Sequence, residues 1–181
     1  AKAANCSIGQ VSKVKNFLSN QSLLTQTEEG IMISDPKILM QQWAQTYNSV
    51  EDEKIGCYSL DSIPNIEKKI AKMKEDIGVD CILTGFSGGS RYQPVVRYQR
   101  IHALIDINDL EKAIHYLGLK KVDTGANVVF IIQYNKCVTS YSNIIHGNLI
   151  ASPVQIYLDS MAIKSRGEEL AETILEREIC K

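Results

Sequence analysis

Residues 7–34 have the sequence SIGQVSKVKNFLSNQSLLTQTEEGIMIS, and this stretch decides how the first part of the chain is interpreted. Ser7 is a suitable N-cap, and the apolar residues after it recur at helical spacing, namely Ile8, Val11, Val14, Phe17 and Leu18. Residues 25–34 alternate around the turn pair Glu29-Gly30, which predicts a β-hairpin. A helix followed by a hairpin is the order of a winged helix-turn-helix, a module that reads DNA.

The residues before Ser7 fit the same interpretation. Ala1–Ala4 is expected to be the end of a preceding helix, and Asn5-Cys6 a tight turn. A complete helix-turn-helix needs one more helix upstream. We therefore expect a truncated module whose first helix is missing, and a correspondingly reduced affinity for DNA.

The predicted helix has a polar side, while its apolar side is expected to pack on the rest of the protein. Residues 1–27 contain three lysines and no acid, although the whole chain has 20 basic and 21 acidic residues. Hydroxyl, amide and ammonium groups can bond to phosphates and base edges. We predict DNA contacts from Lys2, Ser7, Gln10, Ser12, Lys13, Lys15, Asn16 and Thr27. The alternative is that this polar side is the solvated face of a protein-interaction module.

The chain of 181 residues is long enough for one domain or two small ones. Asp35-Pro36 is a helix start, and the helix that follows should leave the hairpin and pack on a second domain, with Trp43 in the core. The polar segment 48–54 is the expected linker. We predict a winged helix-turn-helix with its connecting helix over residues 1–48, and an α/β domain over residues 55–181.

Beyond the linker, short apolar runs alternate with helical ones, which predicts an α/β domain with a mixed sheet. Strands are expected at residues 55–60, 79–84, 101–106, 127–133, 138–145 and 149–151, the fourth of them central because it is continuous and β-branched. Helices are expected at residues 62–78, 107–117, 152–161 and 166–178. The whole chain is thus assigned to the α+β class.

Residues 85–90, with the sequence GFSGGS, follow a predicted strand and are expected to form a glycine-rich turn. The pattern G-x-S-x-G is typical of a nucleophile elbow, with Ser87 as nucleophile, Asp106, Asp109 or Asp123 as acid and His146 as base. A small serine hydrolase is the less favoured alternative, because the domain is short and His146 falls at a predicted hairpin tip.

The pair Gly89-Ser90 is also similar to the phosphate-positioning pair of nucleotidyltransferases. These enzymes need two carboxylates to hold metal ions, and Asp106 has no neighbouring acid at residue 104 or 108. The second alternative is therefore a degenerate domain that binds a nucleotide or phosphate without catalysis. The residues assigned to phosphate contact or to a protein interface are Ser87, Ser90, Arg91, Arg97, Tyr98 and Arg100. Ion pairing of these arginines with local acids is the other possibility.

The five cysteines are scattered and form no CxxC pair, which argues against a disulfide framework and a zinc site. We expect no metal, no cofactor and no catalytic residue. The longest apolar runs are too short for a membrane span, and no leader peptide opens the chain, so a cytoplasmic protein is expected. The oligomeric state stays open.

Several motifs occur in an order that resembles one group of AbiEi-like transcriptional regulators, the antitoxins of type IV toxin–antitoxin (abortive phage infection) systems. These motifs are LTGFSGGSRY at 83–92, VRY at 96–98, GANVV at 125–129, SPVQIYLD at 152–159 and RGEE at 166–169. The similarity extends from about Cys6 to the end of the chain.

The resemblance implies a non-enzymatic, cytoplasmic regulator whose winged helix-turn-helix binds double-stranded operator DNA and represses its own operon. It also implies a C-terminal domain that opposes a nucleotidyltransferase-like toxin, without a requirement for direct binding. The missing first helix departs from the family pattern.

Overall fold

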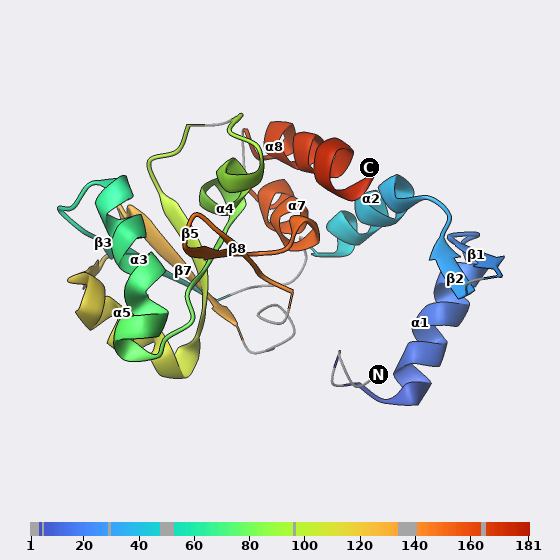
Figure 1. Ribbon diagram of the computed structural model, residues 1–181, viewed down its shortest axis with the longest axis horizontal. Helices are drawn as coiled ribbons and strands as arrows, with labels where there is room; N and C mark the ends of the chain where they lie inside the picture. Colours follow the sequence, from blue (N-terminus) through green and yellow to red (C-terminus); the bar gives the residue numbers. More distant parts are fainter. Residues whose placement is uncertain are drawn as a thin grey trace.

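The computed structural model describes residues 4, 6–28, 30–47, 53–95, 97–133, 141–163 and 166–181. Within them, a seven-stranded sheet has the order β6-β3-β7-β5-β4-β9-β8, and a separate hairpin, β1-β2, lies at the far end of the molecule (Figure 1). The mixture of helices with a mixed sheet confirms the α+β class. The assignment of the N-terminal elements to a winged helix-turn-helix and the division at residues 48–55 stay predictions.

The sheet is mixed because β5 pairs in parallel with β7, and β4 with β9, while its other pairs are antiparallel. Its strands are β3 (Lys54–Tyr58), β4 (Ile82–Thr84), β5 (Ile101–Asp106), β6 (Lys120–Lys121), β7 (Val128–Gln133), β8 (Asn143–Ile145) and β9 (Asn148–Ile150). The apolar strand β7 is interior, as predicted, whereas the short edge strand β6 was not predicted. Part of the predicted strand 138–145 lies outside the described residues.

Helices pack against the sheet in two groups, one of α3 with α5 and the other of α4, α7 and α8. These helices are α3 (Ile63–Ile77), α4 (Gly85–Tyr92), α5 (Leu110–Leu117), α7 (Pro153–Met161) and α8 (Gly167–Ile174), which continues as a π-helix, Leu175–Ile179. Gly78 and Gly118 end α3 and α5 in the left-handed conformation, at φ 69° and 64°. Apolar side chains such as Phe130, Leu104 and Ile66 are fully buried between the layers.

The expected glycine-rich turn at 85–90 is wrong, because these residues form the helix α4. Gly85, at φ 51°, makes the sharp change from strand to helix. A Cβ at Gly88 would lie 2.6 Å from the Leu83 carbonyl oxygen, and one at Gly89 would lie 2.6 Å from Leu170 Cδ2. The glycines therefore let α4 approach its neighbours closely, and they do not form an open loop.

We expect Gly89→Ala to lower the free energy of unfolding by about 1–3 kcal/mol, because the new methyl group overlaps the fully buried Leu170. Urea denaturation followed by circular dichroism measures this loss. Gly9→Ala is the matched control, since its Cβ meets nothing closer than 3.8 Å and alanine favours a helix. Equal stability of the Gly89→Ala variant and the parent would contradict the packing argument.

The N-terminal elements are α1 (Ile8–Asn20), β1 (Leu24–Thr27), β2 (Gly30–Ile33) and α2 (Pro36–Tyr47). The predicted hairpin is confirmed, with Thr27 paired to Gly30 in its antiparallel register. Of the predicted preceding helix, residues 1–3 lie outside the described residues. The hairpin leads into α2, whose start is capped by Asp35 through a 2.9 Å bond from the amide of Ile38.

Helix α2 joins these elements to the body by packing on α7, as predicted. Met40 and Ala44 enter the core, and the Tyr47 hydroxyl donates to Asp159 at 2.6 Å. The expectation that Trp43 belongs to the core is wrong, because 47% of its surface is exposed. Met40 and Ala44 are the only buried residues of α2, so the body covers little of this helix.

Candidate functional site

The start of α1 is fixed by a capping box. The Ser7 hydroxyl accepts a bond from the Gln10 amide at 3.2 Å, and the Gln10 side chain accepts one from the Ser7 amide at 3.0 Å. Two of the predicted DNA-contacting side chains, Ser7 and Gln10, are therefore each bonded to the backbone amide of the other residue. Their bonds leave the other first-turn amides of α1 at an exposed helix N-terminus, a place suited to a phosphate.

The remaining polar residues of α1 are exposed. A turn of 3.6 residues puts Ser12, Lys13 and Asn16 on one continuous side of the helix, which is the arrangement that a groove-reading helix needs. Gln10, Lys13 and Lys15 also line the groove between α1 and the hairpin. Thr27 donates to the Gly30 carbonyl at 3.1 Å and so fastens the hairpin, while Lys2 lies outside the described residues.

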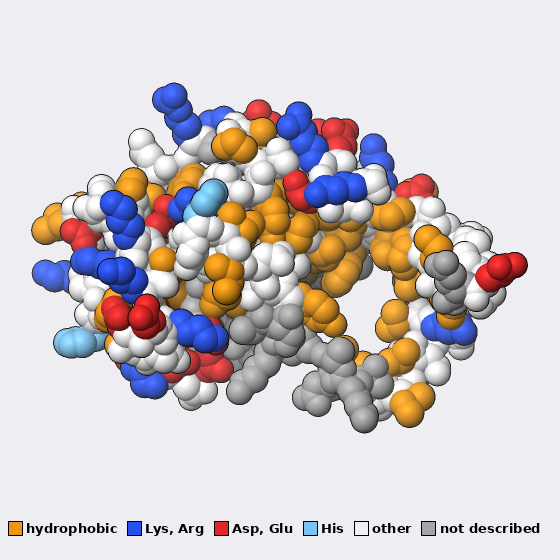
Figure 2. Space-filling model, viewed as in Figure 1, with side chains coloured by type: hydrophobic (Ala, Val, Ile, Leu, Met, Phe, Trp, Pro, Cys, Tyr) orange, Lys and Arg blue, Asp and Glu red, His pale blue; other side chains and the backbone are white. Residues whose placement is uncertain are grey.

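The expectation that the apolar side of α1 packs on the body is wrong. No residue of α1 is buried, and Val14 and Phe17 are each 58% exposed. A groove of about 750 Å³ runs between α1 and the hairpin, lined by apolar residues that include Val11 and Leu24. In Figure 2, hydrophobic side chains gather on the inner side of the N-terminal elements, facing the body. Among the described residues, the body touches these elements through α2 and buries no residue of α1.

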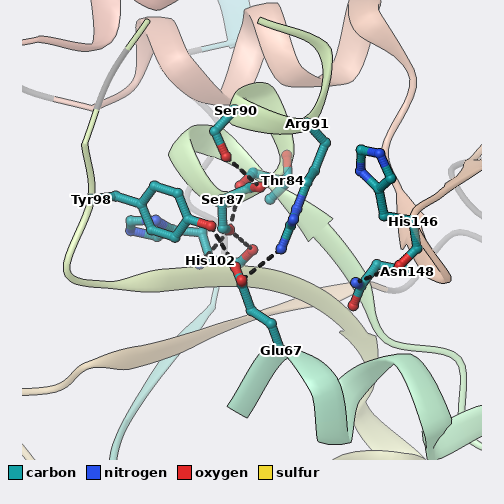
Figure 3. A network of polar contacts seen from close by, with 9 residues as sticks. All are labelled: Glu67, Thr84, Ser87, Ser90, Arg91, Tyr98, His102, His146 and Asn148. Atoms are coloured by element: carbon teal, nitrogen blue, oxygen red, sulfur yellow. Dashed lines mark hydrogen bonds and ion pairs between the residues drawn. The ribbon is translucent and has the colours of Figure 1, made fainter. Parts of the chain in front are cut away.

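The second predicted cluster, around residues 87–100, does not form a single surface. Arg91 pairs with the buried carboxylate of Glu67 on α3 at 2.6 Å, and the Tyr98 hydroxyl donates to the other oxygen of Glu67, also at 2.6 Å. Figure 3 shows Arg91 and Tyr98 converging on Glu67. Arg97 is exposed, and Arg100 donates to the carbonyl of Ala126 at 2.9 Å. For Arg91, the possibility of pairing with a local acid is thus confirmed.

Ser87 is fully buried, which argues against the serine hydrolase alternative, in which Ser87 would be the nucleophile. Its hydroxyl lies 2.9 Å from the carbonyl oxygens of Thr84 and His102 and accepts from the His102 amide at 3.0 Å. Ser90 likewise bonds within α4, to the Ser87 carbonyl. The Ser87 hydroxyl thus ties α4 to β4 and β5 and presents no reactive oxygen to a substrate.

Sequence reasoning did not identify Glu67. Glu67 stands four residues after Ile63 and three before Ile70, so it falls on the apolar face of α3. A carboxylate at such a position predicts a buried partner. That signal was available, but the partners, Arg91 and Tyr98, are distant in the sequence.

His102, at the start of β5, has a pKa well below the usual value for histidine. Burial, assisted by the charges of Arg100 and Lys54, lowers its pKa to about 4. Between about pH 6.5 and pH 4, the unfolded chain therefore binds a proton at this residue that the folded protein does not bind.

We expect this difference to make the protein less stable as the pH falls through that window. The loss is about 3 kcal/mol in the free energy of unfolding, at 1.36 kcal/mol for each unit of pKa. Urea denaturation at pH 7 and pH 4.5 measures it, with His102→Gln as the comparison because glutamine does not titrate. The variant should lose less stability than the parent. Equal losses in the two proteins would contradict a depressed pKa.

The cysteines of the described residues form no disulfide, and no group of three or more metal-ligating side chains occurs among those residues. Burial raises the pKa of Cys81 to about 12, and it also raises that of Cys57. Both thiols are thus protonated near neutral pH and unreactive. Cys137 lies outside the described residues.

A comparison with protein families gives one finding. Residues 32–180 match a family model described as "Transcriptional regulator, AbiEi antitoxin, Type IV TA system". The match covers well over half of the chain and includes the whole sheet, but it begins after α1. No curated protein and no solved structure matches the chain significantly.

Proposed function

Because the chain belongs to the family of AbiEi antitoxins, the transcriptional regulators of type IV toxin–antitoxin systems, we propose that it binds operator DNA and represses its own operon. The observation that carries this proposal is the uncovered polar side of α1. It projects from the body beside a hairpin, and no described part of the chain covers its exposed residues Ser12, Lys13 and Asn16. A winged helix-turn-helix places its reading helix and its wing in this relation.

We assign the predicted DNA-contacting side chains to base edges or to phosphates according to their chemistry. Gln10, Ser12, Lys13 and Asn16 read base edges in the major groove, where an amide suits adenine and an ammonium suits guanine. Lys2 and Lys15 hold phosphates. Ser7 supports the N-terminus of the reading helix, and Thr27 places the hairpin against the flanking backbone.

An antitoxin also counteracts its toxin, and we assign this second function to the C-terminal domain. We propose that it opposes a nucleotidyltransferase-like toxin without needing to bind it, in defence against phage, and that it acts in the cytoplasm without catalysing a reaction. Among the described residues, no helix is both long enough and apolar enough to cross a bilayer.

Titration of the full chain with its own promoter fragment tests the proposal. Fluorescence anisotropy should show tighter binding to the promoter than to a scrambled duplex of equal length, and both affinities should fall steeply as salt rises. Equal affinity for the two duplexes at every salt concentration would overturn operator binding. The protein-interaction alternative would then explain the exposed side of α1.

A further inference from the structure

A second cavity, of about 270 Å³, lies between the sheet and the helices α2 and α7. Its polar lining comes from Lys54 on β3, from Arg100 just before β5 and His102 within it, and from Tyr47, Thr84, Gly85 and Asp159. Strand pairing brings these positions together, because Thr84 lies opposite His102 and Lys54 lies opposite Ile131 on the neighbouring strand β7. This cavity is separate from the network of Glu67, which does not line it.

The cavity has two cations without acidic partners. Among the described residues, neither Lys54 nor Arg100 forms an ion pair, and the bond that Arg100 donates goes to the carbonyl of Ala126. Both charges lie close enough to His102 to depress its pKa. Lys54 and Arg100 outnumber the single carboxylate of Asp159 in the described lining, and this excess of positive charge favours an anionic ligand.

Asp159 is the one carboxylate in this lining, and its oxygens are already engaged. Tyr47 donates to it at 2.6 Å, Gln155 donates at 2.8 Å, and the Thr84 hydroxyl donates to its second oxygen. Asp159 is therefore a structural anchor between α2, α4 and α7. Because Tyr47, Gln155 and Thr84 are neutral donors, these bonds hold the carboxylate in place without cancelling its charge, and the two cations still exceed it in number.

The cavity is also bordered by an unbonded ring nitrogen and by a helix start that no side chain caps. The Nδ1 atom of His102 is buried, and no described residue bonds to it. Thr84 stands at the N-cap of α4, but its hydroxyl bonds to Asp159, and no side chain caps the first turn of that helix. The first turn of α4, with its positive dipole end, thus borders the cavity at Gly85.

We propose that this cavity binds a phosphate group, held between Lys54, Arg100 and the first turn of α4. Arginine, lysine and helix amides together form the donor set that phosphate oxygens accept. The volume is close to the lower limit of ligand pockets, which suits inorganic phosphate or a small phosphate monoester. The inference concerns a small ligand and does not depend on DNA binding.

The test follows the imidazole signal of His102 by NMR, assigned by its loss in His102→Asn. The full chain is titrated with inorganic phosphate, with adenosine monophosphate and with adenosine, at an ionic strength held constant with sodium chloride. Phosphate should shift the His102 signal saturably and leave those of His115 and His146 in place. Tighter binding of the monophosphate would identify a monoester ligand, and tighter binding of inorganic phosphate would identify the free anion.

Matched substitutions decide whether the cavity is the site. We expect Arg100→Gln and Lys54→Gln each to weaken phosphate binding about tenfold or more, because each removes a charge-assisted bond. Arg97→Gln and Lys68→Gln remove exposed charges elsewhere and should leave the affinity unchanged. An absent or unsaturable shift of His102 with every ligand would overturn the proposal, as would equal weakening by the control substitutions.

Discussion

The double substitution Lys13→Ala and Asn16→Ala should abolish the preference of the protein for its own promoter over a scrambled duplex. Each base-edge contact contributes about 1–3 kcal/mol to discrimination, so the double variant should lose about 2–6 kcal/mol of specific binding. Weak, sequence-independent binding should persist, because Lys15 is unchanged. Competition anisotropy with both duplexes measures the two affinities separately.

Three controls separate recognition from folding and from net charge. Alanine favours a helix, so circular dichroism should show that α1 is retained in the double variant. Lys72→Ala removes an exposed lysine from α3 and should leave binding unchanged. Lys15→Ala should weaken binding to both duplexes equally and reduce the salt dependence by about one phosphate contact. A double variant that still prefers the promoter would show that α1 does not read the sequence.

Much of the fold could be predicted because its boundaries are set by local chemistry. Asp35-Pro36 starts α2 and Ser152-Pro153 starts α7, each through a side-chain bond to a first-turn amide. Gly78 ends α3 where the periodic pattern stops. Signals of this kind act within a few residues, so the sequence contains all of the information that they need.

The features that were not predicted depend on distant contacts. The glycines of α4 indicated a turn, yet they form a helix. The Leu83 carbonyl and the Leu170 side chain occupy the space that side chains at Gly88 and Gly89 would need. The pattern of α2 likewise placed Trp43 inside. Its exposure follows from how little of α2 the body covers, and periodicity within one helix does not contain that information.

The candidate sites divide in the same way. The polar side of α1 could be predicted, because it lies on one helix and helical spacing determines it. The cavity at His102 could not be predicted, because Lys54, Gly85 and Arg100 come from separate elements that only the strand pairing brings together. The arginines of residues 91–100 are close in the sequence but lie apart in the structure, where Arg91 forms an ion pair with the buried Glu67.

Replacing Glu67 by alanine should cause the largest loss of stability. The substitution leaves Arg91 partly buried without its carboxylate, and it deprives the Tyr98 hydroxyl of its acceptor. The side chains of Glu67 and Arg91 are only 8% and 23% exposed, so water cannot fully replace the lost bonds. Breaking a buried ion pair of this kind costs about 3–5 kcal/mol in the free energy of unfolding. Urea denaturation at neutral pH measures the loss.

Companion variants show which part of the network causes that loss. Tyr98→Phe removes one bond to the carboxylate and should cost about 1 kcal/mol. The double variant Glu67→Leu with Arg91→Met replaces both charges by apolar groups of similar size, and it should be more stable than Glu67→Ala because no unpaired charge is left. Phosphate binding at His102 should survive in the folded double variant, since neither residue lines that cavity. A cost below about 1 kcal/mol for Glu67→Ala would mean that Arg91 reaches solvent easily when its partner is removed, and that the ion pair does not hold α3 against α4.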